Sequence, residues 1–285
     1  MPSLVGSEMC IRDSPFTTSF HPTDVRTTTR VFEDDLLSCL FSCIHEGGHG
    51  LYDQGLPPKY YGTPLGESVS LGIHESQSRL WENCVGRSRA FWKYFFPLLQ
   101  KKFPDQLRTT TLEDFHTAIN LVKPSLIRVE ADELTYNLHI MVRFEIEIDV
   151  IEKRIKIEDL PELWRVKMNE HLGIIPQTDV EGILQDVHWS FGAFGYFPTY
   201  TIGNLYAAML FQQANKDLPT LQENIAYGNL LSLKEWLNNN IHKHGRQFTS
   251  AQLIQRITGK TLTTEPFLHC LLYTSDAADD TPCVD

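Results

Sequence analysis

The sequence predicts a mainly α-helical protein with one small β element. Two features indicate this class: apolar residues recur at helical spacing along most of the chain, and helix-start signals precede several of those stretches. A single segment near the start, residues 24–32 (DVRTTTRVF), is rich in β-branched residues and predicts a short strand. With 285 residues and 42% hydrophobic content, the chain can bury one sizeable core, or at most two.

The first half of the chain predicts three helices. Asp34 or Asp35 can cap the first, whose apolar positions follow helical spacing: Leu37, Leu40, Phe41, Ile44 and Leu51. Residues 53–67 contain three prolines and predict a loop. A second helix is expected from about residue 72 to residue 95, ending before Pro97. Thr111 and Asp114 form a capping-box pattern at the start of the third.

The second half predicts a strand, a long helix and several shorter ones. Residues 127–129 indicate a short strand, and residues 132–155 a long helix. Pro161 suits the first turn of the next helix. Residues 189–201 are rich in glycine and aromatic side chains and predict a loop. Three further helices are expected near residues 202–215, 230–244 and 249–258.

Both ends of the chain differ from the rest. Residues 1–14 (MPSLVGSEMCIRDS) have no periodicity, and residues 270–285 end in an acidic run of small residues. Both resemble translated sequencing-adapter sequence. We therefore expect a foreign head over residues 1–14, a native catalytic region over residues 15–269 that lacks its natural start, and a foreign tail over residues 270–285.

Composition excludes several classes of function. The formal net charge of -11, without a basic stripe, argues against a nucleic-acid partner. No apolar run is long enough to cross a bilayer, so we expect no membrane partner. The six cysteines form no CxxC pair, and no secretory signal is evident. These features together predict reduced thiols and a cytoplasmic location.

The strongest chemical signal is HEGGH, at residues 45–49. His45 and His49 are four residues apart, so both imidazoles lie on one face of a helix and can bind one Zn²⁺. Glu46 is near the same face and can take a proton from metal-bound water. The competing interpretation is an ordinary amphipathic helix. Against it, Gly47 and Gly48 each cost about 1 kcal/mol relative to Ala inside a helix, which the close approach of another chain or a substrate would explain.

A third ligand is available on the next predicted helix. Hydrolytic Zn²⁺ sites commonly use two His, one Glu and an open water position. Glu75 belongs to HESQSRLWEN at residues 74–83. The residues between His49 and Glu75 are enough for the end of one helix, a loop and the start of a returning helix. His74 must point elsewhere and is about equally well interpreted as a support for a ligand or as a plain polar residue. Glu82, on the same face as Glu75, is interpreted as a structural partner.

Taken together, these stretches resemble the carboxypeptidase Taq family of thermostable metallocarboxypeptidases. Besides HEGGH and HESQSRLWEN, three segments are similar to family motifs in the same order: DVRTT (24–28) to DxRxT, IRVEAD (127–132) to [IV]RxxAD, and GILQDVHW (182–189) to GxxQDxHW. The resemblance spans roughly residues 15–269. One departure is Ser14-Pro15-Phe16, which stands where the family has HPF, at the expected junction with the foreign head.

The resemblance implies a helical, gluzincin-like zinc peptidase (HExxH plus Glu) with a deep groove and a small β element beside it. It implies metal ligands His45, His49 and Glu75, with Glu46 as general base and Zn²⁺ or Co²⁺ as the metal. It also implies a metallocarboxypeptidase that releases single residues from peptides with a free C-terminus, and a homodimer in the complete protein.

An enzyme acting at C-termini must bind a free carboxylate, and arginine does this best through paired N–H donors. The resemblance places the family's carboxylate-binding arginine at Arg128; without it, an arginine paired near Glu130 and Asp132 would be the better interpretation. Arg26 is a second candidate, although Asp24 can occupy it. Tyr136 is a further candidate for a residue lining the groove.

The segment HWSFGAFGYFPTY, residues 188–200, gathers polar side-chain tips on a glycine-rich loop. Related helical zinc peptidases use a His and a Tyr to stabilise the oxyanion at the scissile carbonyl. We nominate His188, together with Tyr196 or Tyr200. Gln185 and Asp186 can orient His188 or a ligand. The remaining aromatic side chains are expected to pack in the core: Trp189, Phe191 and Phe194.

Two other functions remain open on the sequence. A zinc endopeptidase or a dipeptidyl carboxypeptidase would use the same metal site. A non-enzymatic alternative is an inactive, truncated helical fragment that binds metal or peptide without turnover.

Overall fold

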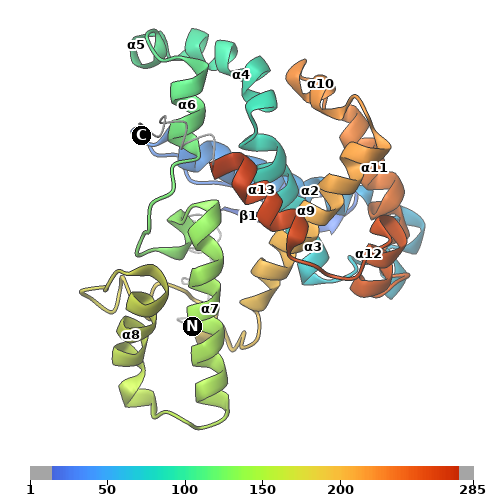
Figure 1. Ribbon diagram of the computed structural model, residues 1–285. Coiled ribbons are helices and arrows are strands. Elements are labelled where there is room, and N and C mark those ends of the chain that lie inside the picture. Colours follow the sequence, from blue (N-terminus) through green and yellow to red (C-terminus); the bar gives the residue numbers. More distant parts are fainter. Residues whose placement is uncertain (1–14, 276–285) are drawn as a thin grey trace. The chain divides into compact units, whose positions relative to one another are not determined.

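The computed structural model describes residues 15–275, which form two compact units: residues 15–119 with 203–270, and residues 120–202 with 271–275. The expected foreign head and most of the expected tail lie outside the described residues. The boundary proposed at residue 270 falls inside the helix α13 (Glu265–Ser275). The prediction of a mainly helical protein with a small β element is confirmed (Figure 1). Within the described residues, no helix has the length and apolar character needed to span a bilayer.

The β element is one antiparallel hairpin in the first unit. Strand β1 (Phe16–His21) pairs with β2 (Asp24–Thr28), placing Thr17 opposite Thr27, and the register shifts between Ser19 and His21. The sequence predicted β2, which ends four residues earlier than expected, but gave no sign of β1. The strand expected at residues 127–129 is wrong, because Arg128–Glu130 form a 3-10 turn.

Helix α2 (Leu36–Gly55) is central to the first unit, since both strands and α3 pack against it. Its start matches the prediction: the Asp35 side chain accepts a hydrogen bond from the Ser38 amide at 3.0 Å. The buried face is unusually polar for a helix, because it includes Glu46 and Asp53 beside Phe41 and Tyr52. Two buried carboxylates on one face require partners there.

The helix expected over residues 72–95 is wrong in two respects. The α-helical part, α3 (Leu71–Arg79), passes into a π-helical segment over Leu80–Gly86, and a new helix, α4 (Arg89–Lys102), starts at the cap residue Ser88. Pro97 lies inside α4 instead of ending the helix before it. Its ring is exposed, so the lost backbone hydrogen bond opens to solvent and not into the core.

The remaining helices of the first unit are short. The capping box at Thr111 is confirmed at the start of α6. The Asp114 amide donates to Thr111 Oγ1, and the Thr111 amide donates to Asp114 Oδ2. The bounds of these helices are α5 Pro104–Leu107, α6 Leu112–Ile119, α10 Leu221–Ala226, α11 Leu231–Asn240 and α12 Ser250–Thr258. Helix α9 (Pro198–Asp217) begins earlier than predicted, and α10 and α13 had no counterpart in the sequence analysis.

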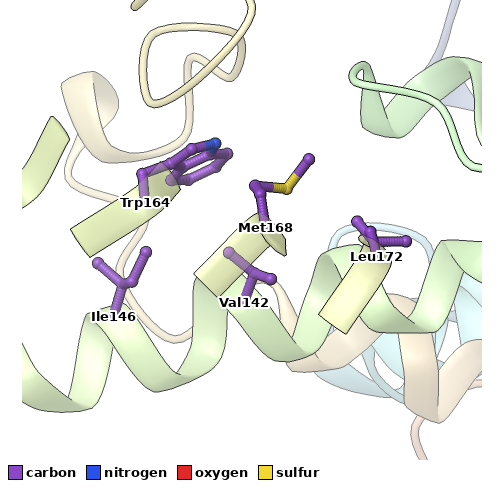
Figure 2. Close-up of a cluster of buried hydrophobic side chains, with 5 residues drawn as sticks. All are labelled: Val142, Ile146, Trp164, Met168 and Leu172. Atoms are coloured by element: carbon purple, nitrogen blue, oxygen red, sulfur yellow. The ribbon is translucent and has the colours of Figure 1, made fainter. Parts of the chain in front are cut away.

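The second unit is built on two long helices. Helix α7 (Glu133–Ile151) is capped by Asp132, and α8 (Leu160–Leu172) carries Pro161 in its first turn, as predicted. The two run side by side, and apolar residues one turn apart on each meet between them (Figures 1 and 2). The cluster consists of Val142, Ile146, Trp164, Met168 and Leu172. Helix α7 ends four residues before its expected end, and Lys153 then adopts a left-handed φ of 56°.

Candidate metal centre and arginine cluster

Three candidate ligands converge between α2 and α3. Donor atoms of His45, His49 and Glu75 all lie within 4.8 Å of one another. Glu75 Oε2 is 3.5 Å from His49 Nε2 and 3.9 Å from His45 Nε2. Tetrahedral Zn²⁺ with bonds of 2.0–2.1 Å places neighbouring donors about 3.3 Å apart. The donor set and its spacing therefore fit one Zn²⁺ or a similar divalent ion.

Glycine packing brings these helices together. A Cβ on Gly48 would lie 2.6 Å from Ser78 Cα and 2.7 Å from the Gln77 carbonyl oxygen, so only glycine allows α2 to approach α3 this closely. A Cβ on Gly203 of α9 would lie 2.5 Å from Glu75 Cγ. By contrast, a Cβ on Gly47 would meet nothing within 4 Å. The close approach of another part of the chain, expected for the glycine pair, is therefore present at Gly48 and not at Gly47.

Two side chains hold Glu75 and His45 in place. Arg79 Nε donates to Glu75 Oε1 at 2.9 Å, which leaves Oε2 as the oxygen nearest both imidazoles. Glu82 Oε2 lies 2.8 Å from His45 Nδ1 and also accepts from Arg79 Nη1 at 3.3 Å. Glu82, interpreted from sequence as a structural partner, thus directly orients a candidate ligand.

The other imidazole has a different partner. His49 Nδ1 lies 2.7 Å from His74 Nδ1, and His74 Nε2 lies 2.9 Å from Asp53 Oδ1. Of the two interpretations of His74, the structure therefore places it against a candidate ligand. Asp53 was not considered from the sequence, although its position four residues after His49 on the same helix was an available signal.

The charges in this cluster shift its pKa values. Burial alone would raise the pKa of Glu75, but His45, His49 and Arg79 outweigh burial and lower it. Burial would also raise the pKa of Glu82, but Arg79 and His45 outweigh burial and lower this pKa to about 2. Burial lowers the pKa of His49, whereas for His45 the two glutamates overcome burial and raise the pKa. Both carboxylates are therefore ionised at neutral pH.

Glu46 directly follows the candidate ligand His45 on α2 and is 7% exposed. The Thr17 hydroxyl of β1 lies 2.6 Å from Glu46 Oε2 and 2.9 Å from the Glu46 carbonyl oxygen. Thr17 thereby restricts the carboxylate to one orientation. This contact could not be predicted from the sequence, because β1 itself was not predicted.

The second polar cluster lies in the second unit, around Arg128. This side chain is buried: Nε and Nη2 donate to Asp186 Oδ1 at 3.1 and 2.7 Å, and Nη1 donates to the Tyr136 hydroxyl at 2.7 Å. Burial would lower the pKa of Arg128, but Tyr136 and Asp186 raise it above its ordinary value. Arg128 is therefore paired with Asp186 and not with Glu130 or Asp132, the acidic neighbours in the sequence.

A second arginine shares the same carboxylate. Arg143 of α7 is fully buried and donates through Nε to Asp186 Oδ2 at 2.7 Å. Gln185 Oε1 accepts from the Arg128 amide at 2.9 Å and from Arg143 Nη2 at 2.7 Å. Gln185 and Asp186 therefore orient two arginines. Their predicted role of orienting His188 has weaker geometric support, because His188 Nδ1 is 3.8 Å from Asp186 Oδ1.

The nominated oxyanion residues adjoin Arg128. His188 Nε2 lies 2.9 Å from the Tyr200 hydroxyl, and the Tyr200 ring centroid lies 4.8 Å from the Arg128 guanidinium carbon. The Tyr196 ring is 5.3 Å from that of His188. Burial, followed by the field of Arg128, lowers the pKa of His188 to about 4. At neutral pH this imidazole is therefore uncharged, and of the two tyrosines it is hydrogen-bonded to Tyr200.

The glycine-rich loop is attached to α7 by Glu147. This buried carboxylate accepts from Trp189 Nε1 at 2.7 Å and from the Gly195 amide at 3.0 Å. Trp189 is partly buried and packs against the buried hydrophobic clusters of the second unit, in line with the expected core packing. The same expectation is wrong for Phe191 and Phe194, which are 72% and 45% exposed.

Arg26, the second candidate for substrate binding, belongs to β2. It is exposed, and Nε and Nη2 donate to the two carboxylate oxygens of Asp24 at 2.8 and 2.9 Å. The pairing with Asp24 considered from the sequence is present. Its side chain is 67% exposed, in contrast to Arg128.

Comparison with known proteins decides the family. A model of the carboxypeptidase Taq (M32) metallopeptidase family matches residues 11–273. The chain belongs to this family. The carboxypeptidase Taq family is one of metallopeptidases, so membership implies a divalent metal, in agreement with the His-His-Glu group.

Relatives within the carboxypeptidase Taq family are similar over nearly the whole chain. Thermostable carboxypeptidase 1 of Thermus thermophilus is 51% identical over 89% of this chain, and carboxypeptidase 1 of Bacillus subtilis is 46% identical over 87%. A crystal structure of an M32 carboxypeptidase from Deinococcus radiodurans R1 matches 93% of this chain with a TM-score of 0.90 and 45% identity, covering 54% of that protein. The chain spans about half the length of the curated relatives it matches.

Proposed function

We propose that this chain is the metal-binding part of a metallocarboxypeptidase that releases single amino acids from the C-termini of peptides. Family membership supports the reaction class, and the convergence of His45, His49 and Glu75 within 4.8 Å is the observation that carries it to these residues. We further propose Zn²⁺ as the metal, with Co²⁺ as a substitute, a homodimer for the complete protein, and a cytoplasmic location.

In the proposed reaction Glu46 is the general base. A divalent ion held by the two histidines and Glu75 would supply a water of lowered pKa and polarise the scissile carbonyl. Glu46 would take a proton from the attacking water and pass it to the departing amine. Thr17 holds the Glu46 carboxylate in one orientation through its hydroxyl group, 2.6 Å away.

Arg128 is proposed to bind the terminal carboxylate of the substrate. Its support is the excess positive charge of its cluster, in which two arginines share Asp186. His188 is proposed to stabilise the oxyanion as a neutral donor, with Tyr200 in preference to Tyr196 because of the hydrogen bond at 2.9 Å. Tyr136 is proposed as a support for Arg128, since its hydroxyl accepts from Nη1.

The test is digestion of one peptide in two forms, with a free and with an amidated C-terminus, by the zinc-loaded chain. Mass spectrometry should show stepwise loss of single C-terminal residues from the free form only. Glu46→Gln should retain one zinc per chain and lose about 10²–10⁴-fold in turnover. Unchanged turnover would exclude Glu46 as the base.

The products separate the alternatives. Internal fragments would indicate an endopeptidase, and released dipeptides a dipeptidyl carboxypeptidase. Bound zinc without cleavage of either form would favour the alternative in which this chain binds metal or peptide without turnover.

A further inference from the structure

A row of hydrogen bonds leads away from the metal centre on the side of His49. Asp53 Oδ1 lies 2.9 Å from His74 Nε2, and His74 Nδ1 lies 2.7 Å from His49 Nδ1. The three side chains are between 12% and 23% exposed, so protein surrounds most of each. Each nitrogen in the row has one defined neighbour.

When His74 is neutral, the chemistry of the outermost group sets the direction of every bond in the row. An ionised carboxylate only accepts hydrogen bonds, so His74 Nε2 must carry the hydrogen. A neutral His74 then has a lone pair at Nδ1 and accepts the hydrogen of His49 Nδ1. The only nitrogen of His49 left with a lone pair is Nε2, the atom 3.5 Å from Glu75 Oε2.

We propose that Asp53 and His74 are positioning residues that hold His49 in the tautomer with hydrogen on Nδ1, so that Nε2 is available as a metal ligand. The inference rests on the proposed metal site, but not on the peptide reaction. His45 is held in the same tautomer without an intervening imidazole, because Glu82 Oε2 lies 2.8 Å from its Nδ1 and accepts directly. One ligand is thus oriented by a carboxylate, and the other by a carboxylate acting through an imidazole.

The hydrogen bonds of the row can also run in the opposite direction, from residue 53 towards His49. If the group at position 53 donated to His74 Nε2, His74 would carry its hydrogen on Nδ1 and donate to His49 Nδ1. His49 would then carry its hydrogen on Nε2, directed at the metal position, and could not bind an ion without rearranging. An asparagine at position 53 permits this reversal, because its amide group can donate.

The surroundings of Asp53 give such an amide room to turn. Asp53 lines a cavity of about 280 Å³ together with Ser19, Tyr61, Glu67 and Arg246. Glu67 lies in the same wall but pairs with Arg246 at 2.8 Å. Glu67→Gln therefore changes the charge of the cavity as Asp53→Asn does, while leaving the row of hydrogen bonds intact. It is the matched control.

Zinc affinity of the full chain, measured by competition with a chelator, tests the proposal. Asp53→Asn and His74→Leu should weaken zinc binding by about 10–100-fold, the usual loss when a partner of a ligand is removed. His74→Asn should lose less than His74→Leu, because Asn Oδ1 takes the place of Nδ1 and can accept from His49. Glu67→Gln should bind zinc as the wild type does.

The tautomer itself can be read in the metal-free full chain by long-range ¹H–¹⁵N correlation of labelled histidines, at mildly alkaline pH where imidazoles are neutral. We expect hydrogen on His49 Nδ1 in the wild type and on Nε2 in Asp53→Asn. A variant that merely loosened the fold would not invert this pattern, and thermal unfolding identifies variants that fail to fold.

Three outcomes would overturn the inference. Wild-type zinc affinity in both Asp53→Asn and His74→Leu would do so, as would a wild-type His49 with hydrogen on Nε2. A wild-type chain that bound no zinc would overturn the metal site and the proposed function together. Tight zinc binding without peptide cleavage would instead contradict the proposed function and leave the inference standing.

Discussion

The two polar clusters use the same kinds of side chain with opposite balances of charge. Around the candidate metal ligands, buried carboxylates outnumber arginines. Arg79 and Arg87 pair with Glu75 and Glu82. Glu46 and Asp53 add two further carboxylates. In the second unit, Arg128 and Arg143 share the single carboxylate of Asp186. The first cluster therefore favours binding of a cation and the second favours binding of an anion.

The pKa of Arg143 reflects the positive excess of the arginine cluster. Burial and the neighbouring Arg128 bring this pKa down to about 10, with Asp186 opposing. Burial would raise the pKa of Asp186, but the two arginines outweigh burial and lower this pKa to about 2. A buried excess of one charge is costly for stability, and a ligand of the opposite charge relieves it. Such an excess in each cluster is what a site for an ionic ligand requires.

Removing the shared carboxylate should have the largest effect on stability. Asp186→Asn leaves two buried guanidinium groups without an anion, and we expect the free energy of unfolding to fall by about 3–5 kcal/mol. Urea unfolding measures the change. Added chloride or acetate should restore part of the loss in this variant and not in the wild type. A loss below about 1 kcal/mol would show that the arginines do not depend on Asp186.

Arg128 and Arg26 test whether the arginine cluster serves the substrate. Arg128→Met should reduce kcat/KM for peptides with a free C-terminus by about 10²–10³-fold, as expected when one partner of a buried charge pair is removed. The exposed Arg26→Ala should leave kcat/KM unchanged, because Arg26 is already paired with Asp24. Equal losses on free and amidated peptides would argue against a carboxylate clamp at Arg128.

Adjacent glycines of α2 test how the metal cluster is held together. Gly48→Ala forces a Cβ against backbone atoms of α3, and we expect a loss of about 1–3 kcal/mol with weaker zinc binding, since Glu75 is carried on that helix. Gly47→Ala meets nothing within 4 Å and should stabilise the chain by up to about 1 kcal/mol. Thermal unfolding and chelator competition on both variants would reveal the contrast, and equal behaviour would contradict the packing argument.

What the sequence predicted well is encoded locally. The spacing of His45 and His49, the cap at Asp35 and the capping box at Thr111 each depend on residues three or four positions apart, and the structure shows these elements where they were expected. Glu75 required one further step, a return helix of the right length, and it does lie beside both histidines.

What the sequence did not predict depends on partners far along the chain. Thr17 reaches Glu46 across 29 positions, and Arg143 meets Asp186 across 43. No periodicity encodes such contacts. The strand expected at residues 127–129 fails for the same reason: the Arg128 amide bonds to Gln185, 57 positions away, and not to a neighbouring strand. The interpretation of Pro97 as a helix end fails because α4 continues through it, with the proline on the exposed side of the helix.

A buried neutral histidine gives the smallest predicted effect, on the pH dependence of stability. His242 is 1% exposed, and its Nε2 lies 2.9 Å from Gln77 Oε1. Burial, then the nearby His74 and Lys234, lower its pKa to about 3. In the unfolded chain the His242 side chain takes up a proton below about pH 6.5, but in the folded chain it does so only below about pH 3. The contribution of His242 to stability is therefore complete above pH 6.5 and is lost as the pH falls.

For this one group the slope is at most about 1.4 kcal/mol per pH unit. His242→Gln removes the titrating group, so its free energy of unfolding should fall less than that of the wild type between neutral pH and about pH 5. The exposed His269→Gln, whose surroundings change little on unfolding, is the control and should retain the wild-type slope. Urea unfolding at both pH values measures the difference. Parallel curves for all three proteins would mean that His242 takes up its proton over the same pH range in the folded and the unfolded chain, contrary to the effect expected of its burial.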